Sequence, residues 1–180
     1  MVIFLALVLA LPVPRPAPAG PSSPLSDEQV REQLGAYLGS IDTPITAERW
    51  SALGPRGRAL LSQLVKDPEA LPTRRAKAVD GLSALHADPQ LFSALAASET
   101  EPLVVRLSAL RGLGQVVPLA RLPERLRPLL EGARDSRVRA GAAEVLAAHQ
   151  GCAQVRAQAA REAEGPRAQF VKALAACGEQ

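Results

Sequence analysis

Four arginines recur in the sequence at spacings of 31, 33 and 28 residues, each followed by the same pattern of small and apolar positions: Arg75, Arg106, Arg139 and Arg167. A guanidinium group can donate several hydrogen bonds to a carboxylate or to backbone carbonyls, or it can bind an anionic ligand. We interpret these arginines as structural links between neighbouring segments, because every copy of the pattern carries one. Contact with a ligand is the alternative.

A second set of charged residues stands five positions after each arginine, and its sign alternates along the chain: Asp80, Arg111, Glu144 and Lys172. Two positions after each arginine stand Lys77, Ser108, Gly141 and Gln169. The alternating charges could form a ladder of ion pairs between copies, or they could contact a ligand. Exposed ion pairs add only about 0–1 kcal/mol each to stability, so a ladder alone would be a weak reason for the pattern. The candidate partner-binding residues are Lys77, Asp80, Arg111, Glu144 and Lys172.

Residue types that support catalysis form no recognisable arrangement in the sequence. It contains no Ser-His-Asp arrangement, no Gly-rich phosphate loop and no HExxH motif. His86 and His149 fall near expected helix ends, where the helix dipole favours a cation. Glu99 and Glu101 lie in an expected connecting loop without an obvious partner. The two cysteines match no zinc-binding pattern, and we expect no enzyme activity, no metal and no cofactor.

The repeated pattern itself predicts helices. Small or apolar residues stand three and four positions after each arginine and leucine stands seven positions after it, which places them on one helix face. Aromatic residues make up only 3% of the chain, so alanine and leucine must build the core, and we expect no sheet. A helix without the pattern precedes each helix that has it. The predicted pairs are 56–66 with 72–86, 89–98 with 102–115, 119–132 with 136–149, and 153–163 with 166–177.

Residues 105–114 (VRLSALRGLG) and 138–146 (VRAGAAEVL) carry the pattern most clearly. They resemble the second helix of HEAT-like repeats, most closely the short bacterial type named after phycobilisome lyases, and the resemblance covers roughly residues 56–178. It implies an all-α fold, an α-solenoid of about four helix pairs whose second helices line a concave surface. It says little about function, because HEAT-like arrays serve as scaffolds, regulatory subunits, lyases and DNA glycosylases.

The chain divides further into a leader, a linker and a cap. Residues 1–19 begin with an apolar run at 2–11 and end in Ala17-Pro18-Ala19, which predicts a signal peptide, although no basic residue precedes the run. An uncleaved membrane anchor is the alternative. Residues 20–25 are rich in proline and serine, which predicts a linker. Residues 26–55 predict two helices that cap the N-terminal end of the repeat domain at 56–180.

Both cysteines fall in the last predicted helix pair. Cys152 precedes the first helix and Cys177 ends the second, so an antiparallel arrangement would bring the thiols together. An exported protein meets an oxidising compartment, in which disulfides persist. We predict a Cys152–Cys177 bridge in an exported chain. Two independent buried thiols are the alternative.

Charge and composition narrow the partner class. The net charge is +3 from 21 basic and 18 acidic residues, which does not indicate a nucleic-acid partner. Residues 104–139 are locally basic, and we interpret them as a solvated face, with an acidic partner or an anionic membrane surface as the alternative. No aromatic residues are interleaved there for base stacking, which is a second argument against a nucleic-acid partner.

We interpret the chain as an exported bacterial protein, periplasmic or secreted. It would be a monomer with no membrane span after signal cleavage. Its expected role is that of a non-catalytic scaffold or adaptor that binds a protein or peptide through its concave second-helix face. The alternatives are a HEAT-like accessory lyase or maturation factor, and a structural or assembly component of the cell envelope.

Overall fold

The computed structural model describes residues 25–40 and 43–178. Within these residues the chain forms ten α-helices, one short 3-10 helix and no strand, which confirms the predicted all-α class. No helix among the described residues is long and apolar enough to cross a bilayer. The signal peptide predicted at 1–19, and all but the last residue of the linker predicted at 20–25, lie outside the described residues.

The helices follow one another through short connections. In chain order they are α1 (Asp27–Gly39), α2 (Ala47–Ala52), α3 (Gly54–Lys66), α4 (Pro72–Ala84), α5 (Pro89–Ala97), α6 (Leu103–Val116), α7 (Leu122–Gly132), α8 (Ser136–Ala148), α9 (Cys152–Ala159), α10 (Glu164–Leu174) and the 3-10 helix η1 (Ala175–Cys177). The four predicted pairs therefore correspond to α3 with α4, α5 with α6, α7 with α8, and α9 with α10.

The observed bounds differ from the prediction where proline or a turn decides them. The helix predicted from 119 begins at Leu122, because the chain first makes a turn in which the Arg121 amide donates to the Pro118 carbonyl. Pro123 then occupies the first helical turn, where a missing N–H leaves no bond unmade. Pro128 lies inside α7 and does not end it. The helix predicted at 166–177 ends at Leu174 and continues as η1.

Side-chain caps fix where several helices begin. The Ser26 hydroxyl accepts a bond from the Gln29 amide while the Gln29 side chain accepts one from the Ser26 amide, which makes a capping box for α1. The Thr46 hydroxyl caps α2 by accepting a bond from the Arg49 amide. Asp88 and Asp135 accept bonds from first-turn amides of α5 and α8. Each cap satisfies an amide that has no partner within its own helix.

Two of the second helices end in the same backbone motif. His86 after α4 and Gln150 after α8 both have positive φ, at 50° and 66°. In each case the amide of the following residue donates to the carbonyl five positions back, which is the Schellman arrangement that satisfies terminal carbonyls. Both residues stand eleven positions after the repeated arginine of their helix. The repeat therefore extends to how these two helices stop.

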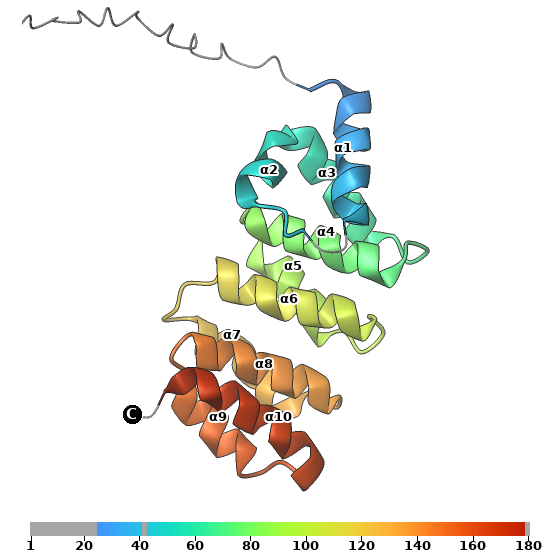
Figure 1. Ribbon diagram of the computed structural model, residues 1–180. Coiled ribbons are helices and arrows are strands. Elements are labelled where there is room, and N and C mark those ends of the chain that lie inside the picture. The colour runs from blue at the N-terminus through green and yellow to red at the C-terminus, as the bar shows by residue number, and fades with distance from the viewer. Residues whose placement is uncertain (1–24, 41–42, 179–180) are drawn as a thin grey trace, which may run out of the picture.

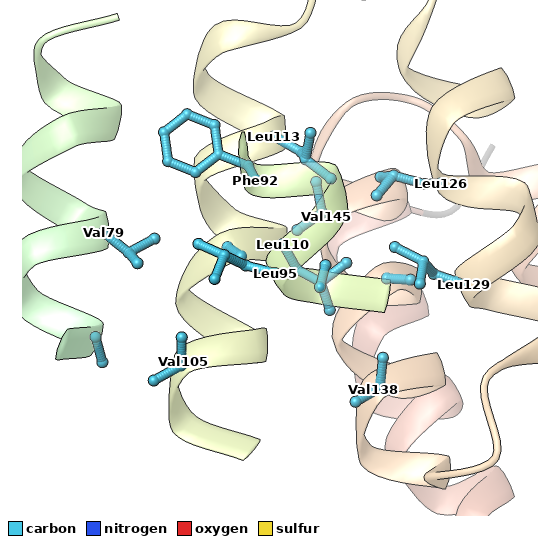
Figure 2. Packing of buried hydrophobic residues seen from close by; sticks show 14 of the residues in the cluster. Val79, Phe92, Leu95, Val105, Leu110, Leu113, Leu126, Leu129, Val138 and Val145 are labelled. Carbon is cyan, nitrogen blue, oxygen red and sulfur yellow. The ribbon is translucent and has the colours of Figure 1, made fainter. Parts of the chain in front are cut away.

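The second helices of the pairs pack on one another in chain order, α4 on α6, α6 on α8, and α8 on α10. Each first helix packs on its own partner, and α1 and α2 contact α3 and α4. Figure 1 shows the helices succeeding one another from α1 at one end to α10 at the other. Their buried side chains form one continuous core, part of which is shown in Figure 2.

Glycine in the second helices permits close contact with neighbouring helices. A methyl group at Gly112 of α6 would stand 3.0 Å from the ring of Phe92, and one at Gly81 of α4 would stand 3.2 Å from Trp50. Trp50 in turn meets Tyr37 edge to face, with the ring centroids 5.4 Å apart. Glycine inside a helix costs about 1 kcal/mol relative to alanine, and here it lets large aromatic rings rest directly on helix backbone.

The core predicts a large effect for one leucine and a small effect for another. Leu113 is 0% exposed, so Leu113→Ala should lower the free energy of unfolding by about 2–5 kcal/mol in urea denaturation. Leu119, in the turn before α7, is 60% exposed, and Leu119→Ala should change that free energy by less than about 0.5 kcal/mol. Equal effects of the two substitutions would contradict the packing described.

Candidate functional site

The first two repeated arginines are buried, at 6% exposed for Arg75 and 5% for Arg106. Arg75 donates from Nε and Nη2 to the carbonyl of Val65, at 3.0 and 2.8 Å, in the last turn of α3. Arg106 donates from Nε to the carbonyl of Ala96, at 3.1 Å, in the last turn of α5. These carbonyls have no partner inside their own helices, so each arginine satisfies the end of the first helix of its pair.

The third and fourth arginines make related bonds. Arg139 donates from Nη1 to the carbonyl of Ala133, the C-cap residue directly after α7, at 2.7 Å. Arg167 donates to the carbonyl of Glu162, in the connection after α9, at 2.9 Å. All four side chains therefore bind backbone carbonyls at or just beyond the end of a first helix. Such bonds are what we expect if the arginines are structural links between neighbouring segments of the chain.

Two of the arginines also bind a carboxylate from the next helix pair. Arg75 Nη2 lies 2.9 and 2.8 Å from the two carboxylate oxygens of Glu101, in the connection before α6. Arg139 makes two bonds, at 2.6 and 2.7 Å, with Glu162, in the connection before α10. The expectation that Glu101 lacks a partner was wrong. One guanidinium thus joins three chain segments, two from its own pair and one from the next.

The sequence carries a signal for these carboxylates that the prediction missed. Glu101 and Glu162 each stand five positions before the arginine of their own copy, and each binds the arginine of an earlier second helix, α4 or α8. Asp135 stands in the comparable connection, but it bonds mainly to Arg137. Its pKa is lowered first by that hydrogen bond, with the charge of Arg106 adding a smaller effect. Among the described residues, no hydrogen bond or ion pair joins Arg106 to Asp135.

The candidate partner-binding residues lie on the second helices. Asp80 of α4 and Arg111 of α6 form an ion pair at 3.6 Å, with side chains 48% and 56% exposed. Arg111 also donates to the hydroxyl of Ser108 at 2.7 Å. Surrounding protein desolvates Asp80 and raises its pKa, while Arg111, Ser108 and Lys77 oppose the rise. Because half of the Asp80 side chain still reaches water, we expect solvent to moderate this rise.

The alternating charges do not continue as a ladder. Glu144 and Lys172 are exposed, and neither forms an ion pair with another described residue. The positions two residues after the arginines also differ from one another. Ser108 and Gly141 are buried, whereas Lys77 is half-buried. Asp80–Arg111 is thus the one rung of the ladder formed among the described residues.

Two hollows border this set of residues. One, of about 360 Å³, lies between the loop before α2 and helices α4 and α6, and includes Lys77, Asp80 and Gln115. The other, also about 360 Å³, lies between α6 and α8 and includes Arg111, Gln115 and Glu144. Gln115 lines both and contacts the buried Ser83 hydroxyl of α4. Four of the five candidate residues therefore line adjoining hollows, and Lys172 lines neither.

The locally basic stretch at 104–139 is dispersed by the fold. The side chains of Arg106 and Arg139 are used in the hydrogen bonds described above, and Arg111 pairs with Asp80. Arg134 pairs with Glu99 at 3.2 Å, and Arg137 with Asp135 at 2.8 Å. The expectation that Glu99 lacks a partner was therefore wrong. The stretch consequently presents no single basic face along the second helices.

Comparisons with models of protein families, with curated proteins and with solved structures find no match. Among the described residues, no group of three or more His, Cys, Asp or Glu side chains is placed to hold a metal ion.

The predicted disulfide between Cys152 and Cys177 is present, with the Cα atoms 6.0 Å apart. It joins the first residue of α9 to the last residue of η1 and closes a segment of 25 residues. The bond holds the C-terminal end of the described chain against the helix that begins the last pair. Both cysteines of the sequence are used in it.

The disulfide predicts a redox-dependent stability. Reduction should lower the free energy of unfolding by about 3 kcal/mol, because the open chain gains entropy in the unfolded state. Urea denaturation with and without reductant measures the difference, and the Cys152→Ser/Cys177→Ser variant should not respond to reductant. Two blocked thiols in the intact mass of non-reduced protein would contradict the bridge.

The Arg139–Glu162 pair predicts a dependence of stability on pH. Its hydrogen bonds lower the pKa of Glu162 from the ordinary value of 4.5, so the stabilisation is present above that pH and lost as pH falls through the folded-state pKa. Glu162→Gln should cost about 1.5–3 kcal/mol at pH 7. Denaturation across pH should show this cost shrinking below pH 4.5, and a cost independent of pH would contradict the assignment.

Proposed function

We propose that this chain is a HEAT-like repeat protein that acts as a non-catalytic scaffold or adaptor for a protein or peptide partner. In this proposal, α3 to α10 are four repeat pairs of an α-solenoid, and α1 and α2, which lie within the predicted cap at 26–55, form its N-terminal cap. The partner binds the face presented by α4, α6 and α8. The observation that carries the proposal is the pair of adjoining hollows on these helices, bordered by Lys77, Asp80, Arg111 and Glu144.

Equivalent bonds in successive pairs support the repeat assignment. The arginine of each second helix binds a carbonyl at or near the end of the preceding first helix. The carboxylate links of Arg75 and Arg139 and the matching ends of α4 and α8 repeat in the same register. Repeat proteins are stabilised by contacts between neighbouring units, and these bonds are contacts of that kind.

The disulfide supports an exported location. Disulfides form and persist in oxidising compartments and are rare where thiols are kept reduced. The apolar run at 2–11 is of signal-peptide length, and the proposal takes 1–19 as a leader removed on export. A bacterial periplasm or the exterior of the cell is the proposed site of action.

The charges on the face support partner binding over a structural role. Asp80 and Arg111 are about half exposed, so their pair contributes only about 0–1 kcal/mol to stability. The Glu144 side chain makes no hydrogen bond or ion pair with the described residues, so its charge takes part in no contact among them. Charged groups of this kind are available to a partner, where complementary charges give specificity.

Removing two of these charges tests the proposal. The Arg111→Gln/Glu144→Gln variant should capture much less partner than the unaltered protein, while its melting temperature changes by less than about 3 °C. The measurement is chemical crosslinking of the mature protein in its native compartment, followed by mass spectrometric identification of what is attached.

A matched control is available on α7. Arg125 and Glu131 are exposed and lie outside both hollows on the second helices, so Arg125→Gln/Glu131→Gln should leave partner capture unchanged. If the Arg111/Glu144 variant loses stability and keeps its partner, the charges are structural and the proposed binding face is wrong.

A further inference from the structure

The hollow between α6 and α8 combines an apolar interior with a charged rim. Leu107 of α6 and Val145 and Ala148 of α8 supply apolar surface, and Gly114 and Gly141 line it without side chains. A methyl group at Gly141 would stand 2.8 Å from Leu107, and one at Gly114 would stand 2.8 Å from Val145. These glycines let the two helices approach closely and leave no side chain of their own to fill the space.

The two charged residues at the rim, Arg111 and Glu144, differ in whether the side chain already has a partner. Arg111 pairs with Asp80 of α4 and donates to Ser108 of its own helix, α6. Glu144, on the α8 side, is exposed and engages no other described residue in a hydrogen bond or ion pair. The unused charge beside this hollow is therefore negative, and a cationic group complements it.

The spacing on α8 limits how such a partner can be built. Glu144 and Ala148 are one helical turn apart, which places their Cβ atoms about 5–6 Å from each other. In an extended chain, side chains on the same face are two residues and about 6.5–7 Å apart. One extended segment can therefore place an aliphatic side chain beside Ala148 and a basic side chain at Glu144.

We propose that the hollow between α6 and α8 binds an extended partner segment through one aliphatic side chain, while Glu144 pairs with a Lys or Arg two residues away in that segment. This inference rests on the proposed function and names the chemistry of the partner that the α4–α6–α8 face accepts. It predicts that recognition at this hollow is set by an apolar anchor together with a positive charge.

A peptide panel tests the inference directly. The probes are acetylated and amidated heptapeptides of glycine and serine in which only the third and fifth positions vary, as Leu with Lys, Leu with Gln, Leu with Glu, and Ala with Lys. They are titrated to millimolar concentration into the full, disulfide-intact protein, and methyl and amide NMR signals of Leu107, Val145 and Ala148 are followed. The Leu–Lys peptide should bind about three- to fivefold more tightly than Leu–Gln, with Leu–Glu and Ala–Lys weaker still.

Three variants give the test its specificity. Glu144→Lys should reverse the order so that Leu–Glu binds best, and it should not lower stability because the Glu144 side chain bonds to no other residue in the described part of the chain. Ala148→Leu adds bulk at an exposed position of the hollow and should abolish binding of every peptide. Glu131→Lys, the same charge reversal on α7, should leave the preference for Leu–Lys unchanged.

Other outcomes overturn the inference. A preference for Leu–Glu by the unaltered protein, a lack of discrimination among the peptides, or no shift at the hollow would each do so. Concentration-dependent shifts of these signals without peptide would assign the hollow to a second copy of the chain.

If native crosslinking captures a partner on the α4–α6–α8 face while the peptides leave this hollow unperturbed, the proposed function stands and this assignment fails. If crosslinking also finds no partner on the face, the proposed function fails with it.

Discussion

The hydrogen bond from a second-helix arginine to a backbone carbonyl at the end of a first helix, where the carbonyl has no partner in its own helix, is the interaction on which this structure depends. A helix leaves its last four carbonyls without partners, and in a chain of short helices that loss recurs at every connection. Here the arginine of each second helix binds a carbonyl at or just beyond the end of the preceding first helix. Arg75 and Arg106 are buried, Arg139 is half-buried and Arg167 is exposed. In Arg75 and Arg139 the guanidinium also binds a carboxylate from the following pair, so the same side chain that closes one pair positions the next. Burying the charge of Arg75 is tolerable because its guanidinium is hydrogen-bonded to both the Val65 carbonyl and the Glu101 carboxylate.

The packing of the second helices follows from how little side chain they carry at their contacts. Alanine and glycine bring α4, α6 and α8 close to one another and to the first helices, and leucine fills the remaining space. Large rings rest on helix backbone, as Phe92 does at Gly112 and Trp50 at Gly81. Among the other polar residues of these helices, Asp80, Arg111 and Glu144 face solvent, whereas Ser83 and Ser108 are buried. The two hollows lie along the solvent-facing positions. The residues that hold the helices together and the residues available to a partner are therefore different residues of the same helices.

The candidate site could be anticipated only in part. The column five positions after each arginine follows from helical periodicity, and the structure brings Asp80, Arg111 and Glu144 to adjoining hollows. Which charges meet could not be anticipated, because ion pairing depends on distances between helices rather than within them. Arg111 reaches Asp80 on one side and not Glu144 on the other. Ser108 and Gly141 are buried although they share a register position with Lys77, since the second helices contact one another on both flanks.

The sequence by itself determined the helical class, the repeat register, the N-caps at Ser26 and Thr46, and the residues that could form a disulfide. These follow from local rules: helical periodicity, hydrogen bonding of side chains to nearby amides, and the backbone limits of proline. The tertiary structure alone decided which partner each charged side chain found, as with Glu101 on Arg75 and Glu162 on Arg139. It also decided that α6 and α8 leave a hollow beside Glu144, whose carboxylate pairs with no other residue within 25–40 and 43–178. Such features depend on how far apart two helices lie and how each is rotated, and those quantities are set by the packing of the whole core rather than by the pattern within any one segment.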